Sequence, residues 1–162
     1  MVKPAVGAGS VDASSYGARD HEAAVEHVAR LHRVGKVVLV QPFVASVATD
    51  GEWPLVFFGG RFSHAASKRV ALPQAGSVDD LFAEETNTDH VASPEQIEAA
   101  QAAVDHICGT LGTPTYARVD LVRDDAGQYC VLEVELVEPS LFLSHADAAA
   151  ADRLAEVLTQ AV

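Results

Sequence analysis

Residues 117–136 read Ala117-Arg118-Val119-Asp120-Leu121-Val122-Arg123-Asp124-Asp125-Ala126-Gly127-Gln128-Tyr129-Cys130-Val131-Leu132-Glu133-Val134-Glu135-Leu136. Apolar and charged side chains alternate on both sides of Asp124-Asp125-Ala126-Gly127, and these four residues have the composition of a tight turn. The pattern predicts a hairpin of two antiparallel β-strands. With a four-residue turn, the predicted cross-strand pairs are Arg123 with Gln128, Arg118 with Glu133, and Asp120 with Val131.

This register divides the hairpin into two faces. The apolar face, which we expect in the core, collects Ala117, Val119, Leu121, Leu132, Val134 and Leu136. The charged face collects Arg118, Asp120, Glu133 and Glu135. Converging carboxylates repel one another unless a cation joins them, and an oxygen-only ligand set suits Mg²⁺ or Mn²⁺ rather than zinc. The alternative is an ordinary solvated face, on which Glu beside Arg is a common cross-strand pair.

The composition is that of an acidic globular chain. Its 162 residues suffice for one domain, or for one domain and part of another, with a sizeable core. The formal net charge of −12 argues against nucleic acid or an anionic membrane as a partner. Cys108 and Cys130 need not pair, no signal-peptide pattern is present, and no apolar run has the length of a membrane span. We therefore expect a cytoplasmic protein.

Helix and strand signals alternate along the first half of the chain. Residues 18–34 predict a helix that ends at Gly35, with an apolar stripe of Ala24, Val25, Val28 and Leu31. Residues 37–43 predict a buried strand, and residues 55–65 predict a hairpin. Residues 74–93 are polar and acidic without a clear period, which predicts a long loop or flap.

Two further helices are predicted in the second half. Ser93-Pro94-Glu95-Gln96 provides an N-cap, a first-turn proline and a capping box. Ser144 is expected to cap a final helix whose apolar positions are Leu154, Val157, Leu158 and Ala161. The order of elements favours the α+β class, with helices packed on one face of an antiparallel sheet.

Polar residues outside the hairpin give signals that are weak when taken singly. Lys3 precedes Gly7-Ala8-Gly9-Ser10, whose glycines let backbone amides approach an anion, although this is not a Walker motif. Gln41 follows an apolar run, where an amide either reads a base edge or meets solvent. The seven histidines have no zinc-ligand spacing, and no nucleophile elbow is present.

In chain order, however, these residues resemble a known family. Residues 2–10 resemble the lysine strand and glycine-rich phosphate flap of the ATP-grasp superfamily, the ligases that join a carboxylate to an amine or thiol. Residues 40–43 resemble its adenine hinge, residues 51–52 its ribose-binding acid, and residues 62–68 the segment with its second phosphate-binding lysine. Residues 118–120 and 132–135 resemble its arginine and metal ligands. Residues 132–142 are similar to the glutathione-synthetase-like or RimK-like branch, to which the D-cycloserine ligases of antibiotic biosynthesis belong.

The resemblance implies a single ATP-grasp domain over residues 1–162. It implies a ligase that uses ATP to activate a small-molecule carboxylate as an acyl phosphate, which an amine then attacks. The implied ATP contacts are Lys3, Gly7, Gly9, Ser10, Gln41, Phe43, Glu52 and Lys68. The implied ligands of two Mg²⁺ (or Mn²⁺) are Asp120, Glu133 and Glu135, with Arg118 as the catalytic residue that stabilises the transferring phosphoryl group.

Two departures from the family pattern keep three hypotheses open. The family's N-terminal substrate-binding region is missing before Val2, so we expect an N-terminally truncated fragment. Residues 74–90 lack the glycine pair and arginine of the family's second flap and are acidic, which disfavours phosphate. The chain is then the nucleotide- and metal-binding part of a ligase, or a stand-alone ATP-binding module, or a degenerate domain without nucleotide chemistry. A stand-alone module would be completed by a separate polypeptide or by homodimerisation through an exposed sheet edge.

Overall fold

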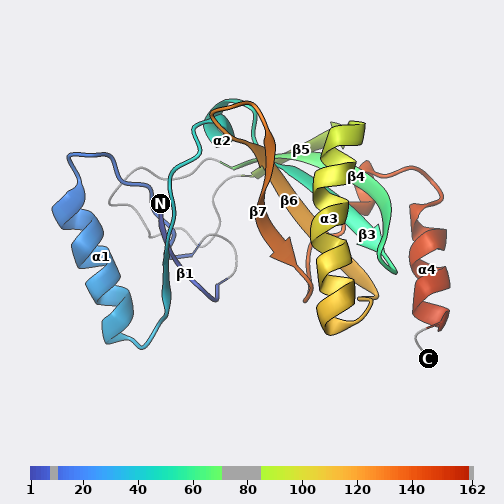
Figure 1. Ribbon diagram of the computed structural model, residues 1–162, viewed down its shortest axis with the longest axis horizontal. Helices are drawn as coiled ribbons and strands as arrows, with labels where there is room; N and C mark the ends of the chain where they lie inside the picture. Colours follow the sequence, from blue (N-terminus) through green and yellow to red (C-terminus); the bar gives the residue numbers. More distant parts are fainter. Residues whose placement is uncertain (8–10, 71–84, 161–162) are drawn as a thin grey trace. The chain divides into compact units, whose positions relative to one another are not determined.

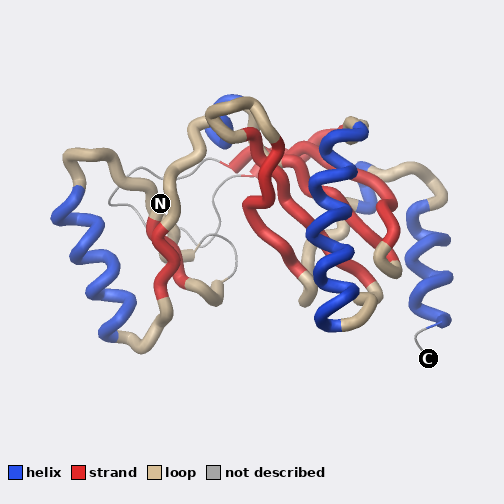
Figure 2. Tube along the Cα trace, viewed as in Figure 1, coloured by secondary structure: helices blue, strands red, loops and turns tan. Residues whose placement is uncertain are grey.

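The computed structural model describes residues 1–7, 11–70 and 85–160. Its elements are β1 (Val2–Pro4), α1 (His21–Arg33), β2 (Val38–Val40), α2 (Ser46–Thr49), β3 (Trp53–Phe58), β4 (Arg61–Val70), β5 (Glu85–His90), α3 (Pro94–Leu111), β6 (Tyr116–Arg123), β7 (Tyr129–Glu135), the 3₁₀ turn η1 (Leu143–His145) and α4 (Ala150–Gln160). Contacts divide the chain into two compact units, built on Met1–Phe43 and on Val44–Arg69 with Thr86–Val162. Both units combine helix and strand (Figure 2). Within the described ranges, no helix has the length and apolar character needed to cross a bilayer.

In the first unit, α1 packs beside a two-stranded antiparallel sheet (Figure 1). β1 pairs with β2 so that Lys3 lies opposite Leu39. Leu31 is fully buried, and His27, one helical turn before it, is almost fully buried. The predicted apolar stripe is therefore wrong in part, because Val25 is 54% exposed. The helix begins later than predicted, at His21, and ends before Gly35. Gly35 has a φ of 75°, which glycine adopts without strain.

The prediction of a buried strand over residues 37–43 is wrong. The strand covers only Val38–Val40, and the side chains of Val37 and Val40 are each 71% exposed. The described part of this sheet has two strands, so that little of the apolar run is covered. An apolar run does not by itself reveal how many neighbours its strand has.

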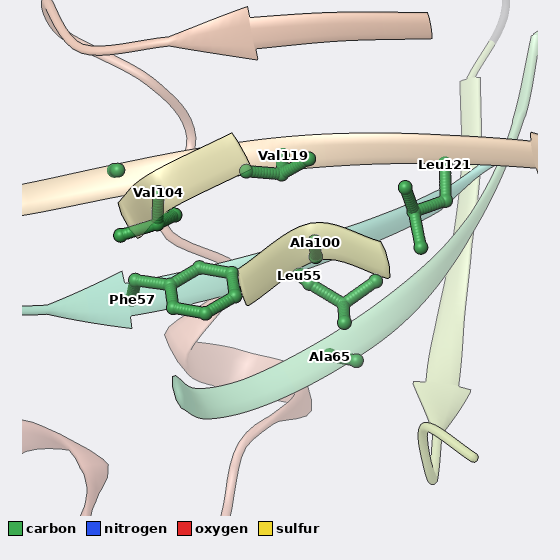
Figure 3. Packing of buried hydrophobic residues seen from close by; sticks show 8 residues of the cluster. Leu55, Phe57, Ala65, Ala100, Val104, Val119 and Leu121 are labelled. Atoms are coloured by element: carbon green, nitrogen blue, oxygen red, sulfur yellow. The ribbon is translucent and has the colours of Figure 1, made fainter. Parts of the chain in front are cut away.

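The second unit is built on a sheet in which five strands are described, in the order β5-β4-β3-β6-β7. Its pairings β3–β4, β3–β6 and β6–β7 are antiparallel. Alternation along β3 directs Leu55 and Phe57 to one face, where they meet Ala100 and Val104 of α3 (Figure 3). This is the larger apolar core of the unit.

The opposite face of the same sheet has a smaller apolar cluster. Val56 and Phe58 of β3 meet Phe142 there, and Leu154 and Val157 of α4 pack against them. Helices therefore contact both faces of the sheet, whereas the sequence predicted helices on one face. The expected α+β arrangement with an antiparallel sheet is present.

The predicted start of α3 is confirmed, and that of α4 is not. Ser93 Oγ accepts a hydrogen bond from the Gln96 amide at 3.3 Å, and Gln96 Oε1 accepts one from the Ser93 amide at 2.9 Å. Ser144 lies in η1, and the group that precedes α4 is Asp147, whose Oδ1 accepts from the Ala149 amide at 2.9 Å. Residues 85–90 of the predicted loop form β5, and residues 74–84 lie outside the described residues.

The hairpin of β6 and β7 forms, but its predicted register is wrong. Asp124 Oδ1 accepts from the amides of Ala126 and Gln128, and the last pair before the turn is Arg123 with Tyr129, so that the turn has one residue more than predicted. A bulge then leaves Leu132 without a partner in the pairing. As a result, Arg118 lies opposite Glu135 and Asp120 opposite Glu133.

The expected apolar face of the hairpin is confirmed on β6 and wrong in part on β7. Ala117, Val119 and Leu121 are completely buried. On β7, by contrast, the side chain of Val134 is 37% exposed. Among the strands that the structure describes, β7 is the last of its sheet and has a neighbour on one side only.

Candidate functional site

Five charged side chains of the second unit form a continuous ion-pair chain. Lys68 Nζ lies 2.6 Å from Glu52 Oε2 and 2.9 Å from Asp120 Oδ2. Arg118 donates from Nε to Asp120 Oδ1 at 2.7 Å and from Nη2 to Glu135 Oε1 at 2.6 Å. We call Glu52, Lys68, Asp120, Arg118 and Glu135 the ion-pair chain. The predicted charged hairpin face thus extends to a lysine and a glutamate from outside the hairpin.

Three strands and one close backbone approach position these groups. β3 lies between β4 and β6, and the Glu52 and Lys68 backbones exchange two hydrogen bonds of 2.8 Å at the start of β3. Arg118 is opposite Val56 in the β3–β6 pairing, so that it lies on the face of the smaller apolar cluster, away from α3.

The ion-pair chain is largely removed from solvent. Asp120 is 0% exposed, Arg118 6%, and Glu52 and Lys68 8% each. Burial alone lowers the pKa of Lys68, but the Asp120 and Glu52 carboxylates outweigh it and raise that pKa above its usual value. Lys68 is therefore a permanent cation at neutral pH.

The ion-pair chain has more negative than positive groups. Its three carboxylates face two cations, and Glu133, opposite Asp120 in the register, adds an exposed fourth carboxylate. Burial raises the pKa of Glu135, and Glu133 and Asp120 raise it further, against the lowering effect of Arg118. The excess of negative charge favours a bound cation.

The carboxylates fit Mg²⁺ in their chemistry, because all the donors are oxygen. In the part of the chain that the structure describes, however, no group of three or more His, Cys, Asp and Glu side chains is close enough to hold a metal ion. Both oxygens of Asp120 accept hydrogen bonds from Arg118 and Lys68. Three of the roughly four lone-pair sites of this carboxylate are therefore taken by cationic side chains, and a metal ion at Asp120 would compete with them.

The other predicted ATP contacts belong to the first unit. Lys3 lies in β1, and Gln41 follows β2, where its backbone exchanges hydrogen bonds with Met1. By strand alternation Lys3 lies on the same side of the sheet as Leu39 and Gln41. Phe43 is 46% exposed, Gly7 is exposed, and Gly9 and Ser10 lie outside the described residues.

Sequence reasoning missed the groups around Arg118. Arg118 Nη1 lies 3.5 Å from the Ser140 carbonyl, and the guanidinium lies 5.6 Å from the centroid of the Phe142 ring. His64, on the same face of β4 as Lys68, reaches the carbonyl of Leu141. The period of two along β4 was an available signal for His64, whereas nothing in the sequence indicated the fold of residues 138–142.

Comparison with solved structures defines the class of the fold. D-alanine–D-alanine ligase from Bacillus anthracis, solved with ATP, matches with a TM-score of 0.63 and 20% identity over 99% of this chain and 52% of that one. The ATP-grasp ligase PsnB, solved with Mg, ADP and a precursor variant, matches with a TM-score of 0.55 and 18% identity over 91% of this chain and 42% of that one. The chain therefore has the ATP-grasp fold. No family model matches it.

A relative with higher sequence identity is DcsG. The cycloserine biosynthesis protein DcsG of Streptomyces lavendulae is 38% identical over 164 residues, which is 99% of this chain and 54% of DcsG. The crystal structure of the D-cycloserine synthetase DcsG matches with a TM-score of 0.86 and 36% identity, over the same shares of both chains. The chain is thus similar to DcsG in sequence and fold, and it spans about half the length of DcsG.

Proposed function

We infer that this chain is the nucleotide- and metal-binding part of an ATP-dependent ligase that forms a bond between a small-molecule carboxylate and an amine. The observation that carries this proposal is the ion-pair chain, because it brings two cations suited to phosphate next to carboxylates suited to Mg²⁺. The likeness to DcsG, a synthetase by name, supports the same conclusion.

The residues divide by the part of ATP that each contacts in this proposal. Lys68 donates to the phosphates from the second unit, and Glu52 accepts from the ribose. In the first unit, Lys3, Gly7, Gly9 and Ser10 contact the phosphates, and Gln41 and Phe43 contact the adenine. The exposed Phe43 ring offers a flat apolar surface for a base.

The reaction needs charge stabilisation more than covalent chemistry from the protein. A carboxylate oxygen of the substrate attacks the γ-phosphorus, and the bond from this phosphorus to the oxygen shared with the β-phosphate breaks. ADP departs, and the substrate has become an acyl phosphate. The amine then attacks the acyl carbon, loses a proton and expels phosphate. Arg118 donates hydrogen bonds to the phosphoryl oxygens during transfer. Asp120, Glu133 and Glu135 would hold Mg²⁺ or Mn²⁺, which would offset negative charge on the phosphates.

A second candidate function is a nucleotide-binding module without ligase activity of its own. One observation favours it: both carboxylate oxygens of Asp120 already accept hydrogen bonds from Lys68 and Arg118. Such a module would be completed by a second copy or by a separate polypeptide.

Calorimetric titration with a non-hydrolysable ATP analogue, with and without Mg²⁺, tests the binding claim. We expect binding that requires Mg²⁺ and is lost in Glu133→Gln. The matched control is Asp125→Asn, which removes an exposed carboxylate from the turn of the same hairpin. No binding by the folded chain, or equal binding by Glu133→Gln, would contradict the proposal. Release of ADP and phosphate that depends on both substrates separates the ligase from the module.

A further inference from the structure

Residues 138–142, which follow the carboxylates of β7, form a segment with an unusual backbone. Glu138 and Phe142 both have positive φ, of 52° and 47°, although neither is glycine. Such residues cost energy unless the surrounding structure holds them in place. Phe142 is 5% exposed and packs in the smaller apolar cluster, so that one end of the segment is fixed by burial.

Arg118 touches this segment on both sides of Leu141. Its Nη1 lies 3.5 Å from the Ser140 carbonyl oxygen, and its guanidinium lies 5.6 Å from the Phe142 ring centroid. The first contact is a long hydrogen bond and the second is a cation–π contact. The position of the guanidinium therefore depends on where residues 140–142 lie, as well as on Asp120 and Glu135.

His64 anchors the residue between these two contacts. Its side chain is 6% exposed, and Nε2 lies 2.7 Å from the Leu141 carbonyl oxygen. The carbonyl can only accept, so Nε2 carries the proton and donates it. Nδ1 then accepts from Ser63 Oγ at 2.9 Å, and Ser63 Oγ accepts in turn from Arg153 Nε at 3.0 Å.

The charged groups around His64 favour a neutral ring. Burial lowers the pKa of His64, and the Arg153 cation lowers it further, against the Leu141 hydrogen bond and Asp147, which raise it. Arg153 itself is paired with Asp147 at 2.7 Å. The ring is thus held as one neutral tautomer that donates to Leu141 and accepts from Ser63.

We propose that His64 is a positioning residue: by holding the Leu141 carbonyl it fixes Ser140 and Phe142, and through them the guanidinium of Arg118. Its importance for phosphoryl transfer rests on the proposed function, whereas its effect on Arg118 does not. The simpler alternative is a buried histidine that only satisfies its own hydrogen bonds. The two explanations differ in whether loss of the His64 hydrogen bonds changes how firmly the guanidinium of Arg118 is held.

The test is the hydrogen-exchange rate of Arg118 Nε–H, measured by NMR in the nucleotide-free chain. In His64→Phe, which keeps a ring and removes both hydrogen bonds, we expect exchange about fivefold faster or more, the change produced by loss of one ordinary hydrogen bond. His64→Gln keeps a donor for Leu141 and should restore most of the protection. Ser63→Ala, which frees the ring to change tautomer, should give a smaller increase and carries the test if His64→Phe does not fold.

The matched control is Leu154→Ala, which shortens an apolar side chain of α4 that packs against the same cluster and cannot form a hydrogen bond or ion pair with His64 or Arg118. We expect it to lower stability and leave the Arg118 exchange rate unchanged. Unchanged exchange in folded His64→Phe, or unchanged exchange in Ser63→Ala where that variant carries the test, would overturn the proposal. So would an equal increase in Leu154→Ala. Because no nucleotide is present, such a failure is distinguishable from a failure of ATP binding in the calorimetric titration.

Discussion

Asp120 is the residue on which the ion-pair chain depends most, because it is completely buried and is paired with both Lys68 and Arg118. Removing one partner of a buried ion pair leaves an uncompensated charge in a poorly solvated place. We therefore predict that Asp120→Asn lowers the free energy of unfolding by about 3 kcal/mol. Urea denaturation monitored by circular dichroism measures this change.

Asp125→Asn is the matched control, since Asp125 is exposed in the turn between β6 and β7. We expect a change of less than about 0.5 kcal/mol for this surface substitution. Similar small changes in the two variants would show that Lys68 and Arg118 do not need Asp120 in the folded chain, against the structure described above.

His64 gives the chain a predictable response to acid. Its folded-state pKa lies below the ordinary value of 6.5, so that the unfolded chain takes up a proton that the folded chain does not. Stability from this group is complete above about pH 6.5 and is lost as the pH falls towards the folded pKa, by at most about 1.4 kcal/mol per pH unit. We predict that the urea midpoint falls less between about pH 7.5 and about pH 5.5 in His64→Gln than in the parent chain.

The comparison between variants is needed because the pKa values of other groups also differ from their ordinary values. Burial raises the pKa of Glu52 and Glu135, whose contributions therefore change with the opposite sign, and these groups are common to the parent and the variant. His106→Gln serves as the control, since His106 is exposed on α3. If His64→Gln and His106→Gln shift the pH dependence equally, His64 is not the responsible group.

At the scale of elements, the approach of β4 to the start of β3 depends on Gly51. Its φ is 81°, and a Cβ added there would lie 2.6 Å from the Lys68 carbonyl oxygen. We predict that Gly51→Ala lowers the free energy of unfolding by about 2 kcal/mol more than Gly127→Ala does. Gly127 has a φ of 80° with nothing within 4 Å of its added Cβ, and this control isolates the clash from the backbone strain.

The same substitution tests how Glu52 and Lys68 are held together. In Gly51→Ala we expect faster amide exchange at Lys68, whose amide bonds to the Glu52 carbonyl. Hydrogen exchange followed by NMR measures this directly. Equal destabilisation by the two glycine variants, with unchanged exchange at Lys68, would mean that the close approach is not required.

The hairpin shows why a sequence pattern can predict faces better than pairs. The turn is longer by one residue than predicted, and each one-residue slip moves a strand's side chains to the other face. The bulge at Leu132 supplies a second slip, which restores the faces and moves the pairing by two positions. Arg118, Asp120 and Glu135 therefore meet on one face as predicted, although the partner of Arg118 is Glu135 and not Glu133.

For the whole molecule, local signals predicted most elements, and the family resemblance predicted the set of candidate site residues. The capping box of α3 and the hairpin at Gly59-Gly60 depend on neighbouring residues alone, and both are present. Which strands pair depends on residues far apart in sequence, and for that reason the exposure of β2 and the pairing of Lys68 with Asp120 could not be predicted. The same holds for the contact of His64 with Leu141, which are 77 positions apart.

The central claim is that the carboxylates of β6 and β7 bind the metal of a metal–nucleotide complex. The most direct measurement replaces Mg²⁺ by paramagnetic Mn²⁺, together with a non-hydrolysable ATP analogue, and records amide NMR signals of the labelled chain. We predict selective broadening at residues 118–121 and 132–136, absent with Mg²⁺ and much reduced in Glu133→Gln. Broadening centred on α3, which lies on the opposite face of the sheet, or nucleotide binding with no broadening at β6 and β7, would contradict it.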